Sequence, residues 1–197
     1  MRGIFITLEG VDGCGKSTLA KSLKSYFESR GRETVLTREP RGKIRELLLN
    51  SKELPDAAEL LLMEASRSEH TETFIKPALA ENKIVICDRY FDSTTAYQGC
   101  ARGLKSDIIE VLNNFATGGL KPDLTLLLDI DAETGLGRQD GIDRISASGL
   151  AFMEKVRRGY LDAAAKEPER IAVIDASEPK EKVFDEAVKI TEERLTI

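Results

Sequence analysis

The chain has 197 residues, 41% of them hydrophobic and 32% charged, which predicts one domain, spanning residues 1–197, with its own hydrophobic core. It holds no run of 18 apolar residues, and its short apolar N-terminus turns acidic at once, so we expect neither a membrane partner nor a signal peptide. The formal net charge of −5 argues against a nucleic-acid partner, which needs a basic face, whereas a small anionic substrate needs only a local cluster of cations.

Cysteine usage indicates a reducing compartment. Cys14, Cys87 and Cys100 are odd in number and include no C-x-x-C pair. We therefore expect free thiols and a cytoplasmic protein, with a metal–thiolate site as the weaker alternative.

Five short runs rich in Ile, Val and Leu alternate with longer amphipathic segments. Their composition is typical of parallel strands that are buried on both faces. The predicted strands cover residues 4–8, 34–37, 84–87, 124–130 and 171–174.

Helices are predicted between and after these strands. A helix over 16–29 ends before Gly31, and Ser106 is the expected N-cap of a helix over 107–116. The other predicted helices cover residues 57–70, 146–166 and 180–195. The alternation predicts an α/β fold of three layers, a five-stranded parallel sheet with helices on both faces. Ligands of such sheets bind at the C-terminal ends of the strands.

The first predicted strand leads into residues 10–17, GVDGCGKS, which match the phosphate-loop pattern G-x-x-x-x-G-K-[ST]. Glycines let backbone N–H groups curl around phosphates, the lysine reaches the β- and γ-phosphates, and the serine hydroxyl ligates Mg²⁺. With glycine near 7% of residues, chance would produce the four fixed positions in about one chain in a hundred. The expected ATP-binding residues are Gly10, Val11, Asp12, Gly13, Cys14, Gly15, Lys16, Ser17 and Thr18.

A second set of basic residues follows other strands. Arg38 comes after the second strand, Arg67 lies on the next helix, and Arg89 follows the third strand. Several guanidinium forks at converging strand ends would hold a second phosphate near the first nucleotide. For any one arginine, a surface salt bridge is the competing interpretation.

The chain resembles the thymidylate kinases over nearly its whole length. The segments that carry the resemblance are 10–13 (GVDG), 38–40 (REP), 88–90 (DRY), 93–99 (STTAYQG) and 143–145 (DRI). The resemblance implies a P-loop kinase that uses ATP and Mg²⁺ to phosphorylate thymidine 5′-monophosphate (dTMP), and that forms a homodimer through helices.

It also implies roles for single residues. Asp12 resembles the family's carboxylate near the acceptor 3′-hydroxyl and the metal. Arg38 and Arg89 resemble the residues around the acceptor phosphate, with Arg89 bridging it to the γ-phosphate. Arg67 resembles the arginine that hydrogen-bonds the thymine edge, and Tyr97 the residue packed on the deoxyribose, although Tyr97 is as readily explained as a core aromatic.

Further substrate-binding residues lie near these. Thr94 and Gln98 belong to the same 93–99 segment and are assigned to the acceptor. Met63 stands where the family commonly stacks phenylalanine on thymine, and its polarizable sulfur is a looser platform. Arg41 is a second departure, since the family usually has glycine there.

The thymidylate kinases supply an arginine to the transferred phosphate either from the phosphate loop or from a mobile lid. The phosphate loop here contains no arginine, so the resemblance implies that a lid over about 137–145 supplies one. This segment is polar and contains two glycines, as a hinged loop would. Arg138 resembles the arginine that packs on adenine, and Arg144 is the candidate for transition-state charge. Arg157 and Arg158 are alternatives that also fit a solvated helix face. Together with Asp12, Lys16 and Arg89, Arg144 completes the expected catalytic set.

Asp88 follows the third strand, where a metal-side carboxylate is wanted, and with Ser17 it forms the expected magnesium site. Asp129 and Asp131 are interpreted as helix caps. His70 is expected on an exposed helix end without a proton-transfer role. Residues 175–177 resemble the family's adenine-side loop.

Two alternatives stay open. The first is another small-molecule kinase of the same scaffold, acting on adenylate, cytidylate, a deoxynucleoside or shikimate. The second is a GTPase-type switch module, which would need a guanine-reading N-K-x-D segment that the chain lacks.

Overall fold

Five parallel strands form the centre of the protein in the computed structural model, which describes residues 3–51, 53–138, 144 and 146–195. The strand order is β2-β3-β1-β4-β5, and all four pairings are parallel. The predicted α/β sheet is confirmed, and each strand ends within one residue of its predicted limit. The strands are β1 (Ile4–Glu9), β2 (Thr34–Arg38), β3 (Ile84–Asp88), β4 (Leu124–Asp129) and β5 (Ile171–Asp175).

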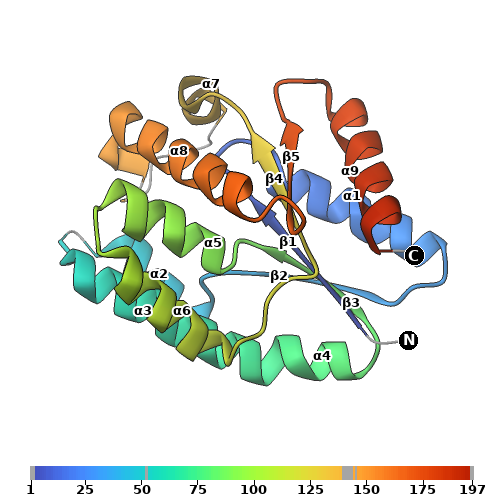
Figure 1. Ribbon diagram of the computed structural model, residues 1–197, viewed down its shortest axis with the longest axis horizontal. Coiled ribbons are helices and arrows are strands. Elements are labelled where there is room, and N and C mark those ends of the chain that lie inside the picture. The colour runs from blue at the N-terminus through green and yellow to red at the C-terminus, as the bar shows by residue number, and fades with distance from the viewer. Residues whose placement is uncertain (1–2, 52, 139–143, 145, 196–197) are drawn as a thin grey trace.

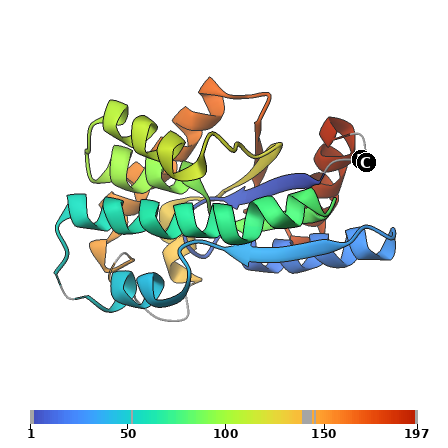
Figure 2. The same ribbon diagram turned by 90° about the horizontal axis from the view of Figure 1, so that it is seen from below.

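Helices connect the strands. Two π-helical segments, Thr71–Ile75 and Thr95–Ala101, extend α3 and α5, and a 3₁₀ turn, Ser146–Ser148, precedes α8. In Figure 2, α3, the first π-helical segment and α4 form one long helix across the molecule. The described α-helices are α1 (Lys16–Ser29), α2 (Gly42–Asn50), α3 (Asp56–His70), α4 (Lys76–Ala80), α5 (Phe91–Thr94), α6 (Ser106–Thr117), α7 (Ala132–Gly137), α8 (Leu150–Lys166) and α9 (Lys180–Leu195).

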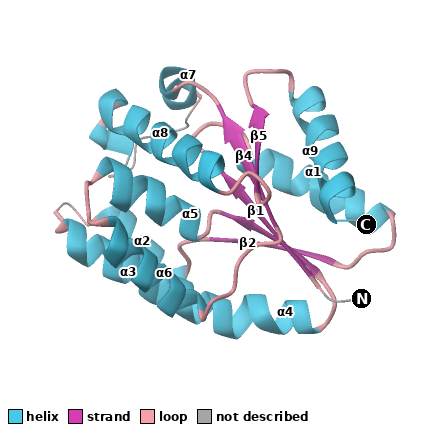
Figure 3. Ribbon diagram, in the orientation of Figure 1, coloured by secondary structure: helices cyan, strands magenta, loops and turns pink. Residues whose placement is uncertain are grey.

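The helices cover both faces of the sheet, which makes three layers (Figures 1 and 3). Helices α1 and α9 pack on one another over one face, and α4 and α8 pack on the strands from the other. Because both faces are covered, every residue of β3 is buried. No helix within the described ranges combines the length and apolarity that crossing a bilayer requires.

Two local predictions need correction, and some short helices were not predicted. Ser106 is the first residue of α6 and its side chain caps nothing; Lys105 stands at the N-cap. Helix α8 starts at Leu150, because Gly149, with φ of 85°, separates it from the 3₁₀ turn. The short helices α2 and α7 were not predicted, and both contribute to the site.

Candidate active site

The glycine-rich loop between β1 and α1 is a tight turn that packs on α7. Gly13 has φ of 77°, and a Cβ there would lie 2.0 Å from the carbonyl oxygen of Gly135. Gly10 has φ of 138°, and a Cβ there would lie 2.4 Å from the carbonyl oxygen of Leu128. Only glycine fits both positions, since any side chain would meet backbone atoms. The loop geometry therefore agrees with a phosphate cradle.

Lys16 is buried at the start of α1 and turned onto the loop itself. Its ammonium donates to the carbonyl oxygens of Gly10 (3.0 Å) and Val11 (2.8 Å) and to the Sγ of Cys14 (3.4 Å). The contacts hold one positive charge against the concave backbone, where phosphate oxygens would compete for the same donor.

The two predicted metal ligands meet beside this loop. The Ser17 hydroxyl donates to Oδ2 of Asp88 at 2.7 Å. Hydroxyl and carboxylate oxygens are hard donors, and Mg²⁺ commonly takes only one or two carboxylates plus water and phosphate oxygens. Within the described ranges no group of three or more His, Cys, Asp or Glu side chains is placed for a metal. The pair therefore fits Mg²⁺ that is held largely by nucleotide phosphates.

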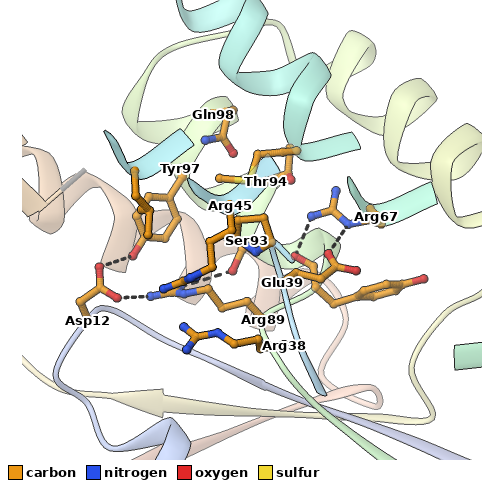
Figure 4. A pocket seen from close by; sticks show the side chains of 14 residues that line it. Asp12, Arg38, Glu39, Arg45, Arg67, Arg89, Ser93, Thr94, Tyr97 and Gln98 are labelled. Atoms are coloured by element: carbon orange, nitrogen blue, oxygen red, sulfur yellow. Dashed lines mark hydrogen bonds and ion pairs between the residues drawn. The ribbon is translucent and has the colours of Figure 1, made fainter. Parts of the chain in front are cut away.

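A pocket opens next to the phosphate loop, with an empty volume of about 610 Å³ including the part open to solvent. All eight residues predicted to bind the acceptor line it. Figure 4 shows most of them as sticks with labels. The lining residues are Asp12, Arg38, Glu39, Pro40, Arg45, Leu49, Met63, Arg67, Arg89, Tyr90, Ser93, Thr94, Tyr97 and Gln98.

Asp12 and Arg89 join the phosphate loop to this pocket. The Nη2 of Arg89 lies 2.5 Å from Oδ1 of Asp12, and the Tyr97 hydroxyl approaches Oδ2 at 3.4 Å. Burial acts to raise the pKa of Asp12, but the positive charges of Arg89 and Lys16 outweigh it and hold that pKa below its ordinary value. A carboxylate, a guanidinium and a phenol thus converge where donor and acceptor would meet.

Arg89 adopts a conformation that bulky side chains rarely take. Its φ is 74°, and its N–H donates to the carbonyl of Leu8 at 3.0 Å. Its Nη1 donates to the carbonyl of Gly10 (3.1 Å) and the hydroxyl of Tyr160 (2.9 Å). Left-handed backbone at a bulky residue persists only where surrounding contacts determine it, and such residues cluster at functional sites.

Glu9, at the end of β1, anchors this arrangement from below. Its carboxylate accepts from the N–H of Tyr90 (2.7 Å) and the hydroxyls of Ser93 (2.6 Å) and Tyr160 (2.9 Å). Burial raises the pKa of Glu9 to about 7, with the nearby Asp92 charge acting in the same direction. Sequence reasoning missed Glu9, because it lies between the predicted strand 4–8 and the phosphate-loop motif that begins at residue 10 and belongs to neither.

Arg67 lies in a buried ionic cluster in the pocket wall. Only 2% of its side chain is exposed, and it donates to Glu39 (2.9 Å), Glu64 (2.5 Å) and Asn113 (3.0 Å). His70 is fully buried, with Nδ1 2.9 Å from Glu39, so its prediction as an exposed helix end is wrong. The His70 ring instead contacts the carboxylate of Glu39, which in turn binds Arg67.

Two further arginines reach the pocket from elements at the edge of the sheet. Arg38, the last residue of β2, is exposed, and no hydrogen-bond or ion-pair partner engages its guanidinium among the described residues. Figure 4 shows Arg38 and Arg89 extending together toward Asp12. Arg45, on the unpredicted α2, lines the pocket and was missed, because nothing in the sequence marked that short helix.

The predicted adenine-side residues also come together. Arg138, directly after α7, donates from Nη1 to the carbonyl of Ala176 at 3.3 Å. The predicted lid over 137–145 falls mostly on residues 139–143 and 145, which lie outside the described residues.

Arg144 is described, and it is engaged away from the phosphate loop. Its Nη2 lies 2.5 Å from Glu59, and its Nε donates to the carbonyl of Leu48 at 3.0 Å. It does not line the acceptor pocket. Its transition-state role therefore stays a prediction that requires release from Glu59.

The acidic residues after β4 divide into two roles. Asp131 caps α7, accepting from the N–H of Thr134 at 2.8 Å, as predicted. Asp129 was predicted to cap as well, but both its oxygens bind Arg157 at 2.7 Å. The pairing occupies Arg157, one of the alternative arginines.

Comparison with known proteins agrees with this geometry. A family model described as thymidylate kinase matches residues 8–187. A thymidylate kinase of Desulfosudis oleivorans is 46% identical, and the match covers 91% of this chain and 92% of that protein. One of Protochlamydia amoebophila is 43% identical, with 98% and 94% covered. The crystal structure of thymidylate kinase from Ehrlichia chaffeensis matches with a TM-score of 0.80 and 36% identity, over 96% of this chain and 99% of that chain. The chain belongs to the thymidylate kinase family.

Proposed function

We propose that this protein transfers the γ-phosphate of ATP to dTMP and so produces the diphosphate that dTTP synthesis requires. The observation that carries the proposal is the contact of Arg89 with Asp12, because it joins the phosphate loop to a pocket with four arginines in its wall. Family membership supports dTMP as the acceptor.

The geometry supports a division of labour in direct phosphoryl transfer. The loop amides and Lys16 would bind the donor phosphates, and Arg38 and Arg89 would bind the acceptor phosphate. Phosphoryl transfer depends mainly on positioning and charge neutralisation, so this chain has little covalent chemistry to perform. The acceptor phosphate is already anionic at neutral pH, and no general base is required of His70.

Magnesium is the metal that fits this site. Ser17 would ligate it directly and Asp88 through water, with donor phosphates completing the shell. When bound, the ion neutralises phosphate charge. Asp12 remains ionised between two cations, which suits a contact with the acceptor 3′-hydroxyl.

The part of the pocket lined by Met63, Leu49 and Tyr97 would select the base and the sugar. Met63 and Leu49 line it as apolar surface against which a pyrimidine can pack. Tyr97 contacts Asp12, and its ring beside the deoxyribose would leave little room for a 2′-hydroxyl. Arg138 beside Ala176 would flank the adenine of ATP.

Coupled ADP release with a panel of acceptors tests the function. With ATP and Mg²⁺ we expect turnover with dTMP, slower turnover with deoxyuridine monophosphate, and little with cytidine or adenosine monophosphates. Turnover confined to another monophosphate, or ATP hydrolysis indifferent to any acceptor, would contradict the proposal.

A homodimer through α6 is also part of the proposal. Ile108, Val111 and Phe115 recur at helical spacing on one face of α6, and Val111 and Phe115 are 67% and 81% exposed. Leu61 is exposed on the neighbouring α3. An apolar patch of this kind marks an interface, and a two-fold axis pairs it with itself.

Phe115→Asp is expected to convert the dimer to a monomer at micromolar concentration. Removing about 2 kcal/mol of apolar burial from each copy raises the dissociation constant about 10³-fold. Sedimentation velocity gives the mass of the species. Leu150→Asp, at an exposed apolar position on α8, is the matched control and should stay dimeric. A dimeric Phe115→Asp protein would rule out this face.

The proposal places this dimer of single-domain subunits in the cytoplasm, where the thiols of Cys14, Cys87 and Cys100 would stay reduced.

A further inference from the structure

Glu59 is a buried carboxylate of α3 that lies behind the wall of the acceptor pocket, in contact with Gln98. Only 1% of it is exposed. One oxygen, Oε1, accepts from Nε2 of Gln98 at 2.7 Å. The other, Oε2, accepts from the guanidinium groups of Arg102 (3.2 Å) and Arg144 (2.5 Å). Gln98 lines the pocket, whereas Glu59 does not touch it.

Two guanidinium groups keep this carboxylate ionised. Burial acts to raise the pKa of Glu59, but the hydrogen bonds from Gln98 and Arg144 and the charge of Arg102 together hold that pKa below its ordinary value. An ionised carboxylate only accepts hydrogen bonds.

The orientation of the Gln98 amide follows from that chemistry. Its NH₂ group must face Glu59, because the opposite orientation would set the amide oxygen against a carboxylate. The oxygen, Oε1, is thereby left for the pocket, and among the described residues no donor engages it. In Figure 4 the amide end of Gln98 points toward the other labelled side chains.

Arg67 presents the opposite polarity in the same wall. Four of its N–H groups are engaged: Nε by Glu39, Nη1 by Glu64 and Asn113, and Nη2 by the carbonyl of Tyr90. A guanidinium has five, so one N–H, on Nη2, has no partner in the part of the chain that the structure describes. Gln98 therefore contributes an acceptor to the wall, and Arg67 contributes a donor.

We propose that Glu59 is a positioning residue for base selection, which acts by locking the Gln98 amide with its oxygen toward the pocket. The inference rests on the proposed function. A base edge that carries a ring N–H beside a carbonyl, as in thymine and uracil, matches this acceptor and donor. Cytosine presents a ring nitrogen acceptor beside an amino donor, which meets like groups at both points and leaves buried polar atoms unpaired.

Glu59→Gln tests the lock with little change of shape. A glutamine at 59 can donate or accept, so the Gln98 amide becomes free to turn over. We expect the ratio of kcat/KM for dTMP to that for deoxycytidine monophosphate to fall at least 10-fold. Arg102→Gln is the matched control, because it removes one ion pair of Glu59 and keeps the Gln98 contact. It should retain the wild-type ratio.

The two hypotheses fail separately. Wild-type protein that does not phosphorylate dTMP contradicts the proposed function, whereas a folded Glu59→Gln protein with the wild-type ratio overturns the role of Glu59. If Glu59→Gln does not fold, the double variant Glu59→Gln/Arg102→Gln replaces it. A neutral residue 59 would leave the Arg102 cation unpaired, and the second substitution removes that cation. An unchanged ratio there overturns the inference as well. Arg102→Gln could instead lose activity and show the same fall in the kcat/KM ratio as Glu59→Gln. That result would assign the fall to the ion pairs of Glu59, and would also overturn the inference.

Discussion

Lys16→Ala is expected to lower kcat/KM for phosphoryl transfer by about 10³-fold or more while the protein stays folded. The ammonium is buried inside the loop, where it bonds the carbonyls of Gly10 and Val11. Without it, charge on the transferred phosphoryl group would lose one of the cations placed to neutralise it. Coupled ADP release at saturating dTMP measures the loss.

An exposed lysine of the same helix provides the control for this change. Lys21→Ala removes an equal charge from α1 at an exposed position and should keep wild-type turnover. Both variants should retain the wild-type far-ultraviolet circular dichroism spectrum. Full activity in Lys16→Ala would show that the loop is not the donor site.

Arg67→Met is expected to lower the free energy of unfolding by about 3–5 kcal/mol at neutral pH. The replacement keeps an apolar stem but leaves the carboxylates of Glu39 and Glu64 buried without their cation. For a chain of this size the melting temperature should fall by about 6–20 °C. Thermal unfolding followed by calorimetry measures the change.

The pH dependence of this loss identifies its cause. In the variant, burial without the Arg67 cation would raise the folded-state pKa of Glu64 further above its unfolded value, so protonation favours the folded state. Burial already raises the pKa of Glu64 with Arg67 present. The deficit should therefore shrink as pH falls toward 5 and grow as pH rises through 7.

Arg30→Met is the matched control, since Arg30 forms an exposed pair with Glu192 at 2.8 Å. Its loss should stay below about 1 kcal/mol. A deficit in Arg67→Met that equals the control, or that is independent of pH, would show that the buried carboxylates do not depend on Arg67.

Much of the fold was predictable because its signals are local. Helix α1 has its predicted bounds, since Gly15 and Gly31 mark its two ends, and each strand is a short run of β-branched and leucine residues. Helix α7 was not predicted, because Gly135 and Gly137 weaken its intrinsic helix propensity. Its position depends on packing against Gly13. Helix α2 has only nine residues, too few for a clear period.

Residues at strand ends were predictable for a topological reason. Because β1, β2 and β3 are parallel neighbours, residues that follow them in sequence meet at one edge. The convergence of Asp12, Arg38 and Arg89 therefore follows from the strand order, and no particular side-chain contact has to be predicted to obtain it.

The sequence by itself determined the family, the phosphate loop and the strand-end residues of the acceptor pocket, because motifs and short-range periodicity encode them. Only the tertiary structure decided that His70 is buried on Glu39, that Glu59 accepts a hydrogen bond from Gln98 and that Arg144 is engaged by Glu59. These partners lie 31, 39 and 85 positions apart. Each pairing depends on how helices pack across the sheet, and at such separations it leaves no local pattern in the chain.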